Sequence, residues 1–347
     1  MPMLYRDKII DTVKVQGPTI TIDWILGNYC NYACSYCFPN TNTGDAKVPP
    51  LDDVMKSNLV HLIDQLRSMP GNTNKQMLFS LSGGEPTMYH DIGPLLDFLK
   101  SHGQIYVITN GSRTLRWWEE HGHKFDDVII SYHVRSADYE HVSKVLNLLL
   151  GKTWLSVHVM VPPTRFEQAT EIYRRFVEDF AKKPVNVMWK LLMEEDGSLM
   201  EYSDEQRAQL AELPPDRPDT PKREFDITTF TMEDGSIVEW QHSVPGDMQG
   251  SFGGYDCYAH HQFITIDRRG RLGMHACWQH YHDRVSIYDE DFSRNFKLST
   301  DAITCEKDWC GCLGLYQTNK QRILDPSARP ARNQNFVRWR ESDWGQA

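Results

Sequence analysis

The cysteines are the residues of this chain with the clearest chemical potential. The 347 residues include eight cysteines in two groups, an early group of Cys30, Cys34 and Cys37 and a late group of Cys257, Cys277, Cys305, Cys310 and Cys312. Nothing in the sequence indicates secretion, and thiolates gathered in a reducing compartment usually hold zinc or iron–sulfur clusters rather than pair as disulfides. The sequence therefore predicts two metal-binding regions.

The early cysteine group has the spacing C-x3-C-x2-C, which gives an incomplete set of ligands. A structural zinc site is closed by four ligands, whereas a cube of four irons held by three cysteines leaves one iron open to another ligand. The sequence here resembles the radical S-adenosylmethionine (AdoMet) enzymes, which share this spacing and an aromatic residue before the last cysteine, as Tyr36 stands here. A structural zinc knuckle is the alternative.

The resemblance also implies residues that bind AdoMet. The run Ser82-Gly83-Gly84-Glu85-Pro86 stands where the family has a glycine-rich motif that contacts the amino group of AdoMet. Paired glycines allow close approach of the backbone, and a carboxylate and free carbonyl groups suit an ammonium group. By itself the run could be a plain turn.

Three further residues match more weakly. Asn110, in Thr109-Asn110-Gly111, and Ser131 end predicted strands at places where the family often contacts the ribose or carboxylate of AdoMet, and Arg135 could pair with the carboxylate. The alternatives are ordinary turn or strand-edge residues and a solvated arginine. The resemblance covers roughly residues 19–192 and does not identify a substrate.

These residues follow a regular alternation of short apolar runs and helical patterns. The predicted strands are Thr19–Leu26, Gln76–Ser82, Gln104–Thr109, Asp127–Tyr132, Trp154–Val161 and Val185–Leu192. Two predicted helices place apolar residues on one face: Met55, Leu59, Leu62, Ile63 and Leu66, and then Ile172, Tyr173, Phe176 and Phe180. Since parallel strands need helical crossovers, we predict an α/β fold: a partial (β/α)6 barrel of parallel strands, with its ligand site at their C-terminal ends.

The predicted domains are a partial barrel over residues 1–193, a polar linker or surface excursion over 194–225, a smaller hairpin-containing cluster-binding region over 226–320 and a tail over 321–347. Hairpin turns are predicted at Asp234-Gly235 and Arg269-Gly270. The smaller region resembles the SPASM or twitch extensions, which implies that four of its five cysteines hold an auxiliary 4Fe–4S cluster. Cys305 is our choice for the spare thiol, which could donate a hydrogen atom. A zinc site is the alternative there.

The resemblance implies an enzyme that reductively cleaves AdoMet to a 5′-deoxyadenosyl radical, which abstracts a hydrogen atom from a substrate. Oxidation of a small metabolite, with the auxiliary cluster as electron acceptor, is the first prediction, followed by epimerisation. Only 29 residues precede Cys30, too few for a leader-recognition domain, so we expect a small molecule, with a peptide delivered by a separate partner as the alternative. An external donor such as flavodoxin or ferredoxin would supply electrons. The alternative of another class is a non-enzymatic zinc-binding protein.

Charge and hydropathy exclude other classes of function. The formal net charge of -10 argues against nucleic-acid binding, and no apolar run approaches the ~18 residues that a membrane span needs. The sequence also lacks the phosphate-loop, nucleophile-elbow and dinucleotide motifs. We therefore predict a cytoplasmic enzyme that binds neither nucleic acid nor membrane.

Overall fold

The computed structural model describes residues 10–16, 18–37, 44, 48–194, 199–213, 227–241, 254–274, 277–305 and 319–322. The chain forms two compact units: unit 1 contains Met1–Asp23, Asp52–Leu78 and Lys222–Ala347, and unit 2 contains Trp24–Leu51 and Phe79–Pro221. This division assigns segments on both sides of the predicted boundary at residue 193 to the same unit. The predicted domain limits therefore remain a prediction.

Unit 2 contains the strands that carry the predicted site. They lie side by side in the order β2 (Thr19–Ile25), β3 (Gln76–Ser82), β4 (Gln104–Thr109), β5 (Asp127–His133), β6 (Trp154–Val161) and β7 (Val185–Leu191), with β2 and β3 contributing only their C-terminal residues to this unit. The pairs β4–β5, β5–β6 and β6–β7 are parallel. The predicted α/β class and all six predicted strands are thus confirmed, each strand within one residue of its expected bounds.

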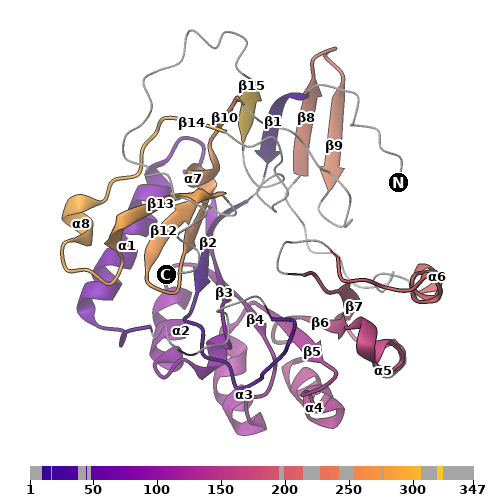
Figure 1. Ribbon diagram of the computed structural model, residues 1–347. Helices are drawn as coiled ribbons and strands as arrows, with labels where there is room; N and C mark the ends of the chain where they lie inside the picture. Colours follow the sequence, from indigo (N-terminus) through magenta and orange to yellow (C-terminus); the bar gives the residue numbers. More distant parts are fainter. Residues whose placement is uncertain are drawn as a thin grey trace. The chain divides into compact units, whose positions relative to one another are not determined.

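Helices cover one face of this sheet (Figure 1). They are α2 (Ile92–Lys100), α3 (Leu115–His121), α4 (Tyr139–Leu149) and α5 (Phe166–Asp179). In β6 the residues Val157 and Val159 are fully buried on the helical side, and the ring of Tyr132 from β5 packs against Phe176 of α5 with 5.3 Å between centroids. Since side chains alternate along a strand, Ser131, His133 and His158 face the opposite side of the sheet.

Short helices complete unit 2. They are η1 (Pro86–Met88), η2 (Gly122–Lys124), η3 (Pro163–Arg165) and α6 (Asp204–Glu212). Helix α6 lies in the predicted linker, and a capping box between Ser203 and Gln206 begins it. The spacing S-x-x-Q is a sequence signal for this helix, which was not among the predicted elements, and the assignment of 194–225 as a linker or surface excursion remains a prediction. Among the described residues, no helix has the length and apolar character needed to span a membrane.

Tyr202 joins the C-terminal ends of two strands in unit 2. Its side chain is 4% exposed, and its hydroxyl accepts a hydrogen bond of 3.0 Å from the Leu192 N–H and donates one of 2.6 Å to the Val161 carbonyl. Both backbone groups lie where β6 and β7 end. The hydroxyl therefore fixes the spacing of these strands at the edge where ligands are expected.

Unit 1 contains a separate antiparallel sheet and helix α1 (Asp53–Ser68). The sheet order is β14 (Ile303–Thr304), β10 (Tyr255–Cys257), β15 (Lys320–Arg322), β1 (Ile10–Gln16), β8 (Ile227–Met232) and β9 (Ile237–Gln241). The hairpin predicted at Asp234-Gly235 joins β8 to β9 and is confirmed. Strands β1, β10, β14 and β15 were not predicted, because their pairing joins segments far apart in the sequence. The five apolar residues predicted on one face of α1 are all buried.

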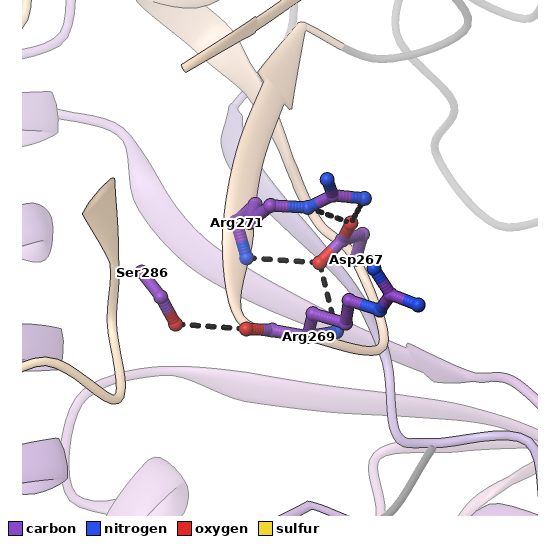
Figure 2. A network of polar contacts seen from close by, with 4 residues as sticks. All are labelled: Asp267, Arg269, Arg271 and Ser286. Atoms are coloured by element: carbon purple, nitrogen blue, oxygen red, sulfur yellow. Dashed lines mark hydrogen bonds and ion pairs between the residues drawn. The ribbon is translucent and has the colours of Figure 1, made fainter. Parts of the chain in front are cut away.

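The hairpin predicted at Arg269-Gly270 is also confirmed in unit 1. It joins β11 (Phe263–Ile266) to β12 (Arg271–Met274), which pairs in turn with β13 (Cys277–Ser286), and the short helices α7 (Ala259–Gln262) and α8 (Phe292–Asn295) flank these strands. Figure 2 shows Asp267 inside the turn, where its carboxylate accepts hydrogen bonds from the backbone N–H groups of Arg269 and Arg271 and pairs with the Arg271 guanidinium at 2.7 Å. The Ser286 hydroxyl donates to the Arg269 carbonyl at 2.8 Å. This network fixes the turn beside β13.

Tyr202→Phe tests the connection between β6 and β7. Without the hydroxyl, the buried Leu192 N–H and Val161 carbonyl lose their partner, so we expect the free energy of unfolding to fall by about 1–3 kcal/mol. Chemical denaturation of this variant and of Glu201→Gln, an exposed neighbour, measures the difference. Equal stability of Tyr202→Phe and the wild type would contradict this role.

Candidate functional site

The early cysteine group lies in the loop that follows β2. Cys30 and Cys34 are half-buried and Cys37 is exposed, and none of the three forms a disulfide. The Tyr32 N–H points at the Cys30 Sγ at 3.3 Å, and the Cys37 N–H donates to the Cys34 carbonyl at 3.2 Å. The loop therefore presents three thiols from one short, turned segment.

The thiols influence each other's ionisation. Burial raises the pKa of Cys30, and the charges of Glu85 and Cys37 raise it further. Burial likewise raises the pKa of Cys34 to about 11, with contributions from Cys37 and Cys30 that outweigh the lowering effect of the Arg135 charge. Protonated thiols are therefore favoured while no cation is bound, and a metal centre that bound here would release their protons.

Gly83 and Gly84 allow two backbone segments at the base of this loop to lie close together. A Cβ on Gly83 would lie 2.7 Å from the Gly27 carbonyl oxygen, and one on Gly84 would overlap the Tyr29 carbonyl. The Gly84 N–H donates to the Gly27 carbonyl at 3.3 Å, and Gly83 has a φ of +125°, which L side chains rarely adopt. The paired glycines thus allow the end of β3 to press against the chain leading to Cys30.

Glu85 connects this contact to the next strand. Its side chain is 2% exposed, and its carboxylate accepts hydrogen bonds from the hydroxyl groups of Thr87 and Thr109, each at 2.6 Å, and from the Asn110 N–H at 2.6 Å. Its own N–H donates to the Tyr29 carbonyl at 2.7 Å. Burial raises the pKa of Glu85, and these hydrogen bonds act in the opposite direction. Glu85 therefore ties the ends of β3 and β4 to the cysteine loop.

The Asn110 side chain also contacts the cysteine loop. Its Nδ2 donates to the Asn31 Oδ1 at 2.9 Å and lies 3.8 Å from the Cys30 Sγ. Asn31 donates in turn to the Ser112 hydroxyl at 2.9 Å, and the Ser112 N–H donates to the Asn110 Oδ1 at 3.0 Å. This closed ring of contacts orients Asn110 toward the thiol of Cys30.

His133, the last residue of β5, contacts the other side of the loop. Its Nδ1 lies 3.4 Å from the Cys34 Sγ and 2.9 Å from the Tyr36 hydroxyl, and its ring stacks on Tyr36 at an interplanar angle of 19°. Burial lowers the pKa of His133 to about 4, so the imidazole is neutral near pH 7. Both contacts are made by Nδ1, which donates or accepts according to the tautomer, so the neutral ring orients Tyr36 and Cys34 without adding charge.

The remaining predicted AdoMet residues lie around this loop. Pro86 is buried in the first turn of η1, and Ser131 is 7% exposed on β5, two residues before His133 and on the same face of the sheet. Arg135 is exposed, and its charge acts on Cys34. The early cysteines, the glycine motif, Asn110 and the end of β5 are therefore brought together, although their roles in binding AdoMet remain predictions.

The donor set of the loop fits a multinuclear iron–sulfur cluster better than a single ion. Three cysteine thiols from one short segment are the typical ligands of such clusters. In a cube of four irons each cysteine binds a different iron, so three thiols in electrostatic range of one another need not converge on a point.

The late cysteine group is described in part. Cys257, in β10, and Cys305, after β14, are both buried, and the Cys305 N–H donates a backbone hydrogen bond of 2.7 Å to the Tyr255 carbonyl. The register Cys257↔Ile303 makes the two cysteines diagonal neighbours on one face, roughly 7–8 Å apart at Cα, too far for a disulfide. The side chain of Cys277 and the residues Cys310 and Cys312 lie outside the described part of the chain.

His133 and Asn31 are contact residues of the site that were not predicted from the sequence. The signal for His133 was the alternation of β5, because a residue two positions after Ser131 faces the same side of the sheet. Asn31 lies between the cysteines, and no feature of the sequence indicated that Asn110 would contact it.

Gly84→Ala tests whether the glycine contact positions the cysteine loop. The added Cβ must displace the backbone at Tyr29, so we expect the purified, anaerobically reconstituted variant to lose most of the iron bound by the early cysteine group. Gly151→Ala is the control for a glycine substitution elsewhere: Gly151 has a φ of +73°, unlike Gly84, but nothing lies within 4 Å of its Cβ position. Equal iron content in the Gly84 variant and the wild type would show that the loop does not depend on this contact.

Comparison with solved structures gives matches of low similarity. Native anSMEcpe with bound AdoMet matches with a TM-score of 0.37 and 17% sequence identity over 49% of this chain and 50% of that chain. BtrN in complex with AdoMet and 2-DOIA matches with a TM-score of 0.35 and 13% identity over 81% of this chain and 77% of that chain.

Two curated relatives match shorter segments, and both are described as S-adenosylmethionine-dependent nucleotide dehydratases. The protein from Psychrobacter lutiphocae is 28% identical over 109 residues, which cover 29% of this chain and 35% of the relative. The protein from Selenomonas ruminantium is 30% identical over 87 residues, which cover 25% of this chain and 28% of the relative. The chain thus spans about a third of the length of the curated relatives it matches.

The family model described as the Radical SAM superfamily matches residues 24–178. This range contains the early cysteine group, the glycine motif and strands β4, β5 and β6, which the structure brings together. Residues 24–178 therefore form a radical SAM superfamily domain.

Proposed function

We propose that this protein is a radical SAM enzyme that uses a 4Fe–4S cluster on Cys30, Cys34 and Cys37 to cleave AdoMet. The observation that carries the proposal is the thiol loop held by Gly83, Gly84 and Glu85 within the radical SAM domain. When bound, the cluster and AdoMet supply reductive cleavage of the sulfonium and abstraction of a hydrogen atom from the substrate. The chain itself supplies the ligands, the orientation of AdoMet and the exclusion of water.

The contacts of the site suggest which groups bind AdoMet and which position other residues. Four donors already surround the Glu85 carboxylate, so we assign it to positioning, and the carbonyl groups of the glycine motif to the AdoMet amino group. The exposed Arg135, whose charge reaches Cys34, suits the AdoMet carboxylate. We assign Tyr36, Asn110 and Ser131 to contacts with the remaining parts of the cofactor. These roles extend the predictions made from the sequence.

We propose a small molecule as the substrate and its oxidation as the net reaction, with an auxiliary 4Fe–4S cluster on four of the late cysteines as electron acceptor. An external flavodoxin or ferredoxin would deliver the electron that AdoMet cleavage consumes. The burial of Cys257 and Cys305 on one face supports both as ligands, so Cys305 is no more suited than its neighbours to be the spare hydrogen-atom donor. Epimerisation and peptide modification are the other reactions open to this chemistry.

Dehydration is a second candidate, because two relatives are described as nucleotide dehydratases. Oxidation removes two electrons from the substrate, whereas dehydration removes water without net redox change. Product analysis after anaerobic incubation with AdoMet, reductant and extract of the source cell therefore separates the two.

Cys34→Ala tests the proposed AdoMet site. With one ligand of the early cluster removed, we expect reductive formation of 5′-deoxyadenosine to disappear while iron bound by the late cysteine group remains. Chromatography of the products and iron and sulfide analysis measure both quantities. Cys257→Ala is the reciprocal control, which should lose the late iron and keep the early cluster. Formation of 5′-deoxyadenosine by Cys34→Ala would refute the assignment, and a colourless wild type that contains zinc would support the non-enzymatic alternative.

His133→Phe tests the polar contact with Cys34. Phenylalanine can keep the stacking on Tyr36 but removes Nδ1, and hydrogen bonds to cluster sulfurs raise reduction potentials, so we expect a more negative midpoint potential for the early cluster. A redox titration followed by electron paramagnetic resonance measures this shift. The exposed His123, replaced in the same way, serves as the control. An unchanged potential in His133→Phe would show that His133 does not act on the cluster.

A further inference from the structure

The face of the sheet opposite helices α4 and α5 carries two polar residues, His158 and Lys190, that the proposed AdoMet site does not use. In the register of β5, β6 and β7, Ser131 pairs with His158 and His158 with Met188. Further toward the C-terminal edge, His133 pairs with Met160 and Met160 with Lys190. Paired residues of parallel strands point to the same side, so these side chains share the face that includes His133.

His158 is a buried polar residue on this face. It is 7% exposed. Burial, assisted by the charge of Lys190, lowers the pKa of His158 to about 3. The imidazole is therefore neutral near pH 7 and has a donor and an acceptor to offer. A neutral imidazole beside a cationic side chain can donate or accept a hydrogen bond with a ligand on this face.

Lys190 supplies a positive charge beside His158. Its side chain is exposed, and within the described part of the chain it forms neither an ion pair nor a hydrogen bond. The surrounding protein nevertheless removes enough water from the ammonium group to lower the pKa of Lys190. Lys190 is the diagonal neighbour of His158, within reach of its long side chain. A cation that is partly desolvated, and that has no partner among the described residues, favours an anion.

The strand register places Lys190 and His158 relative to the early cysteine group. His133, which lies 3.4 Å from the Cys34 Sγ, is in the same register row as Lys190. Neighbouring strands are about 4.8 Å apart, so the row from His133 to Lys190 spans two such spacings, roughly 10 Å. A molecule of metabolite size that is bound at Lys190 thus extends toward the proposed AdoMet site.

We propose that this face binds the substrate and that the substrate carries an oxyanion, a carboxylate or a phosphate, held between Lys190 and a hydrogen bond donated by His158. The identification of the bound anion as the substrate rests on the proposed function. The anion site itself is independent of AdoMet cleavage. It narrows the substrate class to small anionic molecules. Neutral sugars and uncharged natural-product intermediates would lack the group that the pair recognises.

Calorimetric titration of the anaerobic, cluster-loaded protein with pyrophosphate and with succinate tests the anion site at constant, low ionic strength. We expect saturable binding of at least one anion, and the tighter of the two identifies the phosphate or the carboxylate form. Lys190→Gln should raise its Kd roughly tenfold or more, and His158→Phe about fivefold, because a charge-assisted hydrogen bond contributes more than a neutral one. Lys182→Gln, an exposed lysine before β7, is the matched control and should bind like the wild type.

Three results would overturn the proposal: no binding of either anion, equal affinity in Lys190→Gln and the wild type, or a loss of AdoMet affinity in Lys190→Gln that parallels the loss of anion affinity. The last would place Lys190 in the AdoMet site. A wild type that binds the anion through Lys190 but forms no 5′-deoxyadenosine would refute the proposed function and leave the anion site in place. The thermal midpoint of each variant excludes unfolding as the cause of weak binding.

Discussion

The position of the early cysteine group depends on how closely two stretches of backbone approach one another. The chain at Gly83 and Gly84 lies so near to Gly27 and Tyr29 that no Cβ fits between them. Because Cys30 follows Tyr29 directly, this contact fixes where the thiol loop leaves β2. A glycine-rich motif is usually explained by the close approach of a ligand to the backbone. In this protein Gly83 and Gly84 allow the close approach of another segment of the chain.

Buried polar groups extend this constraint to the neighbouring strands. The Glu85 carboxylate accepts hydrogen bonds from Thr109 and Asn110 at the end of β4, and Asn110 reaches Asn31 between the cysteines. On the other side, His133 at the end of β5 contacts Cys34 and Tyr36. The ends of three successive strands therefore act on one short loop. The described residues of the loop, 26–37, form neither helix nor strand, so these contacts determine where the three thiols lie.

Much of this organisation was predictable from local patterns, and the failures have physical causes. The parallel strands are short apolar runs with helical crossovers, so their bounds agree with the sequence to within a residue. Strand β1 pairs with β8 and β15, more than two hundred residues away, and no local signal encodes such a partner. The sequence also indicated Glu85 as a residue of the site, but only the structure shows four donors around its carboxylate. The contact of Asn110 with Asn31 depends on the loop path, which spacing alone does not determine.

The proposed function requires that three thiolates hold a cluster with one open iron to which AdoMet binds. Electron–nuclear double resonance on the reduced, reconstituted protein, with AdoMet that carries an isotope-labelled amino nitrogen, tests this coordination directly. We predict a hyperfine coupling between the cluster and the labelled nitrogen. A cluster signal that shows no coupling to the label, although AdoMet is bound to the protein, would contradict this coordination.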